Sequence, residues 1–96
     1  MEHLSKIELI GRVGAVDERI IGNERLVRFS VGVNTMFKNR DGAVASTTWF
    51  NCTYWGNIVI KKGQDIHLEG WMVGQTYVDE EGRDRQYLEV KVNRIW

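Results

Sequence analysis

Apolar side chains recur at every second residue through most of this chain, and this alternation is the strongest constraint on its fold. In residues 25–33, for example, Val27, Phe29 and Val31 fall on one face of an extended segment and their neighbours on the other. A period of two indicates β-strands with one buried face. Turn-forming residues separate the extended segments at 22–23, 39–42 and 79–82. The pattern therefore predicts an all-β protein.

The alternation divides into five predicted strands, over residues 6–14, 25–33, 47–55, 65–78 and 86–95. The one helical candidate, residues 57–62, is rich in β-branched side chains, so a very short or absent helix is expected there. Glycines inside the first, second and fourth strands indicate bulges and sharp bends. Five strands with so short a segment between the third and fourth predict an OB fold, which is a five-stranded Greek-key barrel.

Composition limits both the size and the function of the chain. Ninety-six residues, of which 43% are hydrophobic, suffice for a single domain, predicted to span residues 1–96. Thirteen basic and thirteen acidic side chains exclude a strongly basic nucleic-acid binder. One cysteine, Cys52, permits neither an internal disulfide nor a thiolate metal cluster. No apolar run has the length of a signal peptide or a membrane span, so we expect a cytoplasmic protein without a membrane partner.

The third predicted strand carries large aromatic side chains on both faces. Alternation places Trp49 and Trp55 on one face, and Phe50 and Tyr54 on the other. Because only one face of each strand points into a small barrel, one of these pairs must lie outside it. Such an outer face either packs against another subunit or lets bases stack on it, at about 1–3 kcal/mol per base.

Two further aromatic side chains, Phe37 and Tyr77, are predicted beside hairpin turns. A side chain near a loop tip has little core to fill, and an exposed aromatic group without a partner is unfavourable. Taken alone, Phe37 is explained equally well by packing over its own hairpin, and Tyr77 by a place on the surface of the sheet. Together with Trp49 and Trp55, the two residues indicate a base-stacking surface.

Five short stretches occur in order along the chain: residues 5–14 (SKIELIGRVG), 29–34 (FSVGVN), 48–56 (TWFNCTYWG), 62–70 (KGQDIHLEG) and 77–82 (YVDEEG). They resemble N-K-V-I-L-I-G-N-L-G, F-S-V-A-T-N, T-E-W-H followed by F-G, K-G-S-x-V-x-V-E-G and W-T-D-x-x-G of the bacterial single-stranded DNA-binding protein (SSB) family. Each match is short, but five in order at compatible spacing are specific, and the resemblance extends along almost the whole chain. The resemblance implies the same OB fold.

The resemblance assigns the family's four base-stacking positions to Phe37, Trp49, Trp55 and Tyr77, all aromatic here. It implies sequence-independent binding of single-stranded DNA in replication, recombination or repair. It also implies a homotetramer, with a dimer as the alternative. Because stacking hardly distinguishes the sugars, RNA stays open as a ligand.

Polar side chains near these aromatics are the candidate phosphate contacts. They are Lys38, Arg40 and Lys62, together with Asn51, which stands where the family has a basic residue on the third strand. With so few cations, we expect stacking to contribute more to the affinity than ion pairing does.

His67 and Trp71 share one face of the fourth predicted strand. We predict that both lie in a subunit interface, because Trp and His suit half-polar contacts. The alternative for Trp71 is an additional base-stacking position. The sequence ends at Trp96, where the family continues into a flexible region and an acidic tail. We therefore expect either a short form of the family or an isolated binding domain, and the resemblance gives no support for the family's tail-mediated repair partners.

Two other functions compete with DNA binding. An enzyme is the weaker competitor, because His3 and His67 have no nucleophile at motif spacing, and neither a cofactor nor a metal motif occurs. The stronger competitor is an OB module for protein contacts, like a primosomal scaffold related to SSB, with weak binding of single-stranded DNA.

Overall fold

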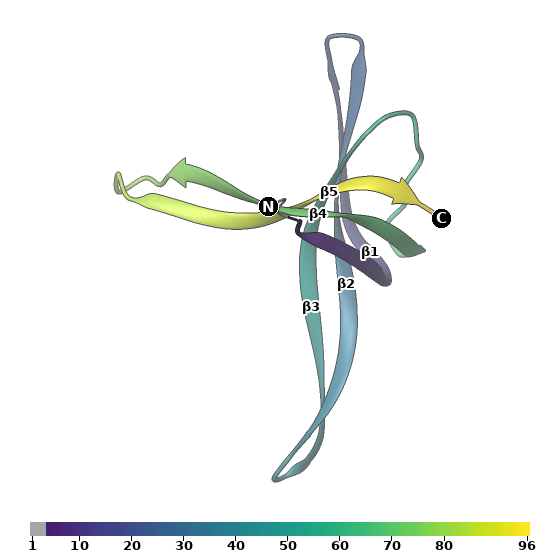
Figure 1. Ribbon diagram of the computed structural model, residues 1–96, viewed down its shortest axis with the longest axis vertical. Helices are drawn as coiled ribbons and strands as arrows, with labels where there is room; N and C mark the ends of the chain where they lie inside the picture. The colour runs from purple at the N-terminus through teal and green to yellow at the C-terminus, as the bar shows by residue number, and fades with distance from the viewer. Residues whose placement is uncertain (1–3) are drawn as a thin grey trace.

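The computed structural model describes residues 4–96, which form five strands and no helix (Figure 1). The strands are β1 (Lys6–Ile21), β2 (Glu24–Asn39), β3 (Gly42–Trp55), β4 (Asp65–Val78) and β5 (Asp84–Ile95). They close a barrel in the order β1-β2-β3-β5-β4, in which only the short β3–β5 pairing is parallel. The predicted all-β OB barrel is thus confirmed, with the helix between β3 and β4 absent.

Within residues 4–96 there is likewise no helix that could cross a membrane. His3, one of the two histidines in the sequence, lies outside the described residues.

The core lies where the inward faces of the five strands meet. Its largest fully buried side chains are Val13, Val27, Val31, Cys52, Leu68 and Val90. Phe29 is buried among them, and Phe50 and Tyr54 are partly buried against them, as the alternation predicts.

Burial, followed by the nearby charge of Glu89, raises the pKa of the Cys52 thiol to about 12. The thiol therefore stays protonated at neutral pH and acts as a small apolar group.

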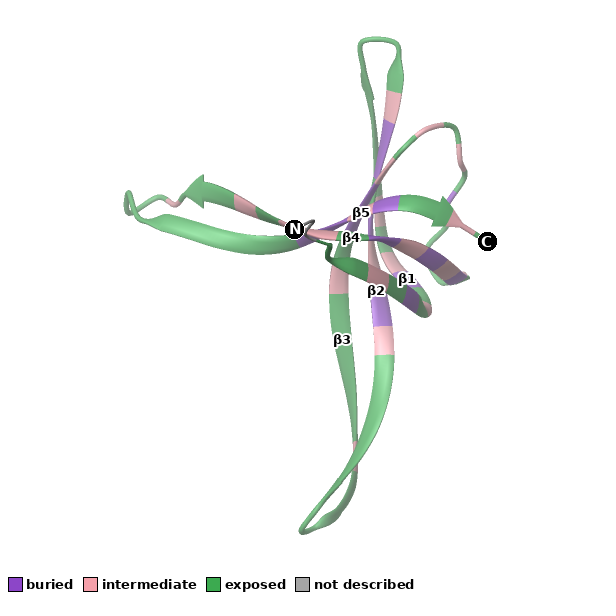
Figure 2. Cartoon of the chain, in the orientation of Figure 1, coloured by how far each residue is buried: buried purple, intermediate pink, exposed green. Residues whose placement is uncertain are grey.

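Three hairpins continue the strand pairs beyond the barrel as arms. In Figure 1 the β2–β3 arm points downward, the β4–β5 arm points to the left, and the β1–β2 hairpin points upward. The first two arms are exposed along almost their whole length (Figure 2). They raise the radius of gyration to 15.8 Å, compared with about 12–13 Å for a compact domain of this size.

The arms account for the difference between the predicted and the observed strand ends, because the predicted strands are shorter than the observed ones. β1 continues to Ile21, β2 continues to Asn39, and β3 already starts at Gly42. Outside the barrel neither face of a hairpin is buried, so the apolar alternation that predicts strands stops there.

Register shifts occur beside two of the predicted strand glycines. β1 shifts against β2 between Val13 and Val16, next to Gly14, and β4 shifts against β5 between Glu69 and Gly70. At Gly32 of β2, in contrast, the ladder to β3 is regular. Gly32 therefore does not mark a register shift; in the ladder it lies directly opposite Trp49 of β3.

Candidate nucleic-acid interface

Trp49, Asn51 and Trp55 lie on the outer face of β3, as the alternation predicts. Trp49 is 59% exposed and Trp55 is 47% exposed, whereas the inward-facing Cys52 between them is buried. Six residues along a strand correspond to about 20 Å. The two indole rings are therefore separate contact points on one surface, and a single base cannot reach both.

Two glycines of neighbouring strands support the Trp49 ring. A Cβ atom added to Gly14 of β1 would lie 2.5 Å from Cζ3 of Trp49, and one added to Gly32 of β2 would lie 2.9 Å from Cζ3 and Cη2. No real side chain fits at these distances, so only glycine permits this approach of backbone to ring. The rest of the indole stays open to solvent, and Trp49 is thus held as a supported, accessible ring. We call Gly14 and Gly32 the glycine floor.

Lys62 belongs to the segment between β3 and β4, which is bound to β1 by its backbone. The N–H of Gly63 donates a hydrogen bond of 2.8 Å to the carbonyl of Val13, and the N–H of Val13 donates one of 2.9 Å to the carbonyl of Gln64. Val13 directly precedes Gly14 of the glycine floor. Lys62 therefore lies near the Trp49 end of the surface.

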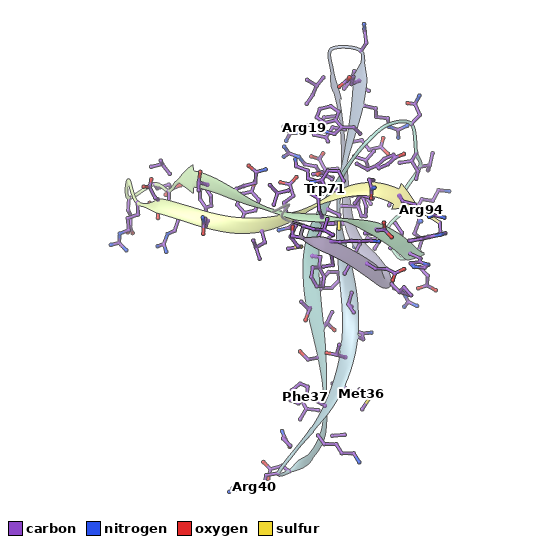
Figure 3. The ribbon with its side chains drawn as sticks, viewed as in Figure 1. Arg19, Met36, Phe37, Arg40, Trp71 and Arg94 are labelled. Atoms are coloured by element: carbon purple, nitrogen blue, oxygen red, sulfur yellow. The ribbon has the colours of Figure 1, made fainter. Side chains whose placement is uncertain are left out.

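Phe37, Lys38 and Arg40 lie on the β2–β3 arm, away from the barrel, with Arg40 at its end (Figure 3). Phe37 is 53% exposed. Its ladder position is five residues beyond the Gly32–Trp49 pair, or about 17 Å. Because side chains alternate along a strand, Lys38 shares the Trp49 face of the ladder and Phe37 lies on the opposite face. The structure thus does not bring Phe37 and Trp49 together.

Tyr77 lies on the β4–β5 arm, where it packs against Tyr87. The two ring centroids are 5.9 Å apart, and the ring planes are inclined by 56°. Tyr87 also lines a groove on the outer side of the barrel together with Asn51. Tyr87 thus links Tyr77 to the outer face of β3, a role that the sequence did not reveal because it depends on the pairing of β4 with β5.

Asp79 orders the turn at the end of the β4–β5 arm. Its Oδ1 accepts hydrogen bonds of 2.9 Å from the backbone N–H groups of Glu81 and Arg83, and its Oδ2 accepts one of 2.9 Å from Nε of Arg85. The Arg83 N–H, followed by the Arg85 guanidinium, lowers the pKa of Asp79. The ionised carboxylate thereby holds Arg85, which pairs directly opposite Tyr77 in the ladder.

His67 and Trp71 lie on the outer face of β4, next to β1 and β5 rather than on the Trp49 surface. The Nε2 atom of His67 is 2.7 Å from Oε2 of Glu8, and its ring stacks on Trp96 with the centroids 3.9 Å apart. The guanidinium of Arg94 lies over Trp96 at 4.5 Å. Trp71 itself is exposed, so this face combines an ordered polar cluster with an open indole.

The family model described as "Single-strand binding protein family" matches residues 4–96. A protein named "Single-stranded DNA-binding protein 1" from Chlorobaculum tepidum is 27% identical over 93 residues, which cover 88% of this chain and 57% of that protein. A protein of the same name from Xylella fastidiosa is 29% identical over an aligned length of 105 residues, and the match covers 99% of this chain and 77% of that protein. The chain thus spans little more than half the length of the Chlorobaculum relative.

Solved structures show the same fold. The chain superimposes on an SSB from Plasmodium falciparum, described in complex with ssDNA, with a TM-score of 0.86 and 22% identity, covering 97% of this chain and 90% of the other. A small single-stranded DNA-binding protein from Streptomyces coelicolor gives a TM-score of 0.76 and 18% identity, covering 99% of this chain and 94% of the other.

Proposed function

The chain belongs to the single-strand binding protein family, and we propose on this basis that it binds single-stranded DNA by stacking bases on exposed aromatic side chains. This is a family of DNA-binding proteins and not of enzymes. The observation that carries the proposal is Trp49, an indole supported by the glycine floor and still 59% exposed. Buried aromatic rings stabilise a core, whereas a ring held open in this way is suited to stack on a flat ligand.

The other aromatic side chains extend the binding path beyond Trp49. Trp55 takes a second base on the same face of β3, and Tyr77 and Phe37 take bases along the two arms. The distances of about 17–20 Å that separate Trp49 from Phe37 and from Trp55 imply a DNA strand that runs over the protein instead of entering one pocket. Because every base offers a flat face, this stacking is independent of the sequence, and RNA stays a possible ligand.

Polar side chains hold the nucleic-acid backbone along this path. In our proposal Lys62 contacts phosphates at the Trp49 end, and Lys38 and Arg40 contact phosphates along the β2–β3 arm. Asn51 lies between the two tryptophans and donates hydrogen bonds to the ligand. The proposed role of the protein is to cover single-stranded DNA during replication, recombination or repair.

Fluorescence quenching tests this function directly. Addition of poly(dT) at low salt should quench the Trp emission, because bases stack on Trp49 and Trp55. If the folded protein shows no quenching and no shift of a labelled oligonucleotide, DNA binding is wrong. The protein would then be an OB module for protein contacts, which is the alternative that the sequence leaves open.

The glycine floor leads to a first prediction. Replacing Gly32 by Ala should weaken the binding of oligo(dT) about tenfold, because the new Cβ would lie 2.9 Å from the Trp49 ring and displace it. A fluorescence titration measures the affinity, and circular dichroism verifies the fold. The matched control is Gly74→Ala, since no heavy atom lies within 4 Å of a Cβ at Gly74. Equal affinities of the two variants would show that the floor does not position the ring.

Salt dependence provides a second prediction. Three phosphate contacts, from Lys38, Arg40 and Lys62, release few counterions, so a plot of log K against log [salt] should have a slope near −2. Titrations against oligo(dT) between about 50 mM and 200 mM NaCl measure this slope. A slope of −5 or steeper would mean that ion pairs, and not stacking, dominate the affinity.

We further propose that the chain folds as a single domain and assembles into a homotetramer, with a dimer as the alternative. The face that carries His67 and Trp71 is the proposed contact between subunits, because its exposed indole and ordered polar cluster match the composition of interfaces. Native mass spectrometry of the protein and of a Trp71→Glu variant measures the assembly. A protein that stays monomeric at micromolar concentration would contradict this proposal. The proposed location is the cytoplasm, at the nucleoid.

A further inference from the structure

A groove is lined by residues 51–53 of β3, which lie between Trp49 and Trp55 in the strand. Its volume is about 310 Å³, and its lining includes Arg28 of β2, Asn51 of β3, and Tyr87 and Glu89 of β5. This size lies at the lower end of the range for small-molecule pockets, about 300–1,000 Å³, and fits a ligand of few atoms. The groove combines aromatic, donor and acceptor groups on the path proposed for the nucleic acid.

Glu89 gives the groove an unusual chemical feature, because it is a carboxylate only 7% exposed. Its Oε1 accepts a hydrogen bond of 2.7 Å from Oγ1 of Thr53 and lies 2.9 Å from Nζ of Lys91. Burial by itself would raise the pKa of Glu89, but the hydrogen bonds from Thr53 and Lys91 and the charges of Lys91 and Arg28 outweigh it and lower the pKa. The carboxylate is therefore ionised at neutral pH and only accepts hydrogen bonds.

The second oxygen of Glu89 accepts no such hydrogen bond. Within residues 4–96, the side-chain hydrogen bond to Glu89 ends on Oε1, and no side-chain oxygen or nitrogen there is both enclosed and unsatisfied, so Oε2 is not sealed off from solvent. Since Glu89 lines the groove, Oε2 is left as a fixed acceptor on its wall. Arg28 and Asn51 also line the groove; both are exposed, and Arg28 makes no ion pair with another residue of 4–96, so both have free donors.

We propose that this groove holds one nucleobase with an exocyclic amino group, best matched by cytosine, and thereby adds a base preference to the stacking. The N4 amino group of cytosine donates to Oε2 of Glu89, a pairing of carboxylate with cytosine that is common in nucleic-acid recognition. Arg28 and Asn51 donate to the O2 and N3 acceptors of the same base. Uracil and thymine place a carbonyl oxygen, O4, where cytosine has its amino group. This oxygen and Oε2 of Glu89 are both acceptors, so they repel each other instead of forming a hydrogen bond.

The inference rests on the proposed binding of single-stranded DNA, and oligo(dC) and oligo(dU) of equal length test it at neutral pH. Cytosine and uracil differ at position 4 and in the adjoining N3 proton, and the methyl group of thymine is absent from both. The wild-type protein should bind oligo(dC) about tenfold more tightly than oligo(dU). The Glu89→Gln variant offers an amide N–H₂ donor to the groove, so its preference should vanish or reverse.

Two further variants make the result decisive. Glu80→Gln removes the same charge from the exposed turn of the β4–β5 arm and should keep the preference for dC. Asn51→Ala changes an exposed side chain and should lower the ratio even if Glu89→Gln fails to fold. Equal wild-type affinities for oligo(dC) and oligo(dU) would overturn the base pocket while leaving DNA binding intact. Failure to bind either oligonucleotide would instead overturn the proposed function.

Discussion

Replacing both Trp49 and Trp55 by Ala should lower the affinity for oligo(dT) by about 2–6 kcal/mol, which is roughly 30-fold to 20,000-fold. Each indole is expected to contribute about 1–3 kcal/mol of stacking energy. The rings lie about 20 Å apart on β3 and share no partner, so the two losses should add. Both side chains lie outside the core, and the barrel should fold without them.

Fluorescence anisotropy of a dye-labelled oligo(dT) suits this experiment, because the variants lack the tryptophans that report binding. The single variants define the additivity. Trp96→Ala is the matched control, since Trp96 is also an exposed indole but stacks on His67 at the β4 face. It should bind oligo(dT) like the wild type. A double variant with wild-type affinity would show that DNA does not bind on the outer face of β3.

The fold was largely predictable because the barrel buries one face of each strand, and burial of one face produces the period of two. β4 was predicted with both of its ends, because its first half alternates and the predicted turn at residues 79–82 directly follows its last residue. The predictions for β1, β2 and β3 stopped short at the arms, where no face is buried. Strand pairing in the arms is set by the turns and the ladder of backbone hydrogen bonds, which leave no mark on the hydrophobic pattern.

The sequence predicted those features of the site that lie along a single strand, but not the contacts between strands. Alternation along β3 suffices to place Trp49 and Trp55 together on one face, and the resemblance to the family identifies that face as the binding surface. The glycine floor requires the registers of β1 with β2 and of β2 with β3, because Gly14 and Gly32 meet the same ring from two different strands. Tyr87 depends in the same way on the register between β4 and β5. Cross-strand contacts of this kind cannot be read from spacing along the chain.

Replacing Gly70 by Ala should destabilise the barrel by about 1–3 kcal/mol or more. A Cβ at Gly70 of β4 would collide with the backbone carbonyl oxygen of Lys91, and it would lie 3.0 Å from Cα of Val92. These are backbone atoms of β5, and a flexible side chain cannot move aside in their place. Urea unfolding followed by circular dichroism measures the loss of stability.

Gly74→Ala is the control on the same strand, where a Cβ has no heavy atom within 4 Å. It should leave the stability unchanged or raise it by up to about 1 kcal/mol, because alanine has fewer conformations in the unfolded chain. The contrast is informative because β5 pairs with β3 at Val90 and Lys91, directly beside the Gly70 contact, and this pairing closes the barrel. Lys91 also holds Glu89 at the groove. Equal stability of the two variants would show that the close approach of β4 to β5 is not what keeps the barrel closed.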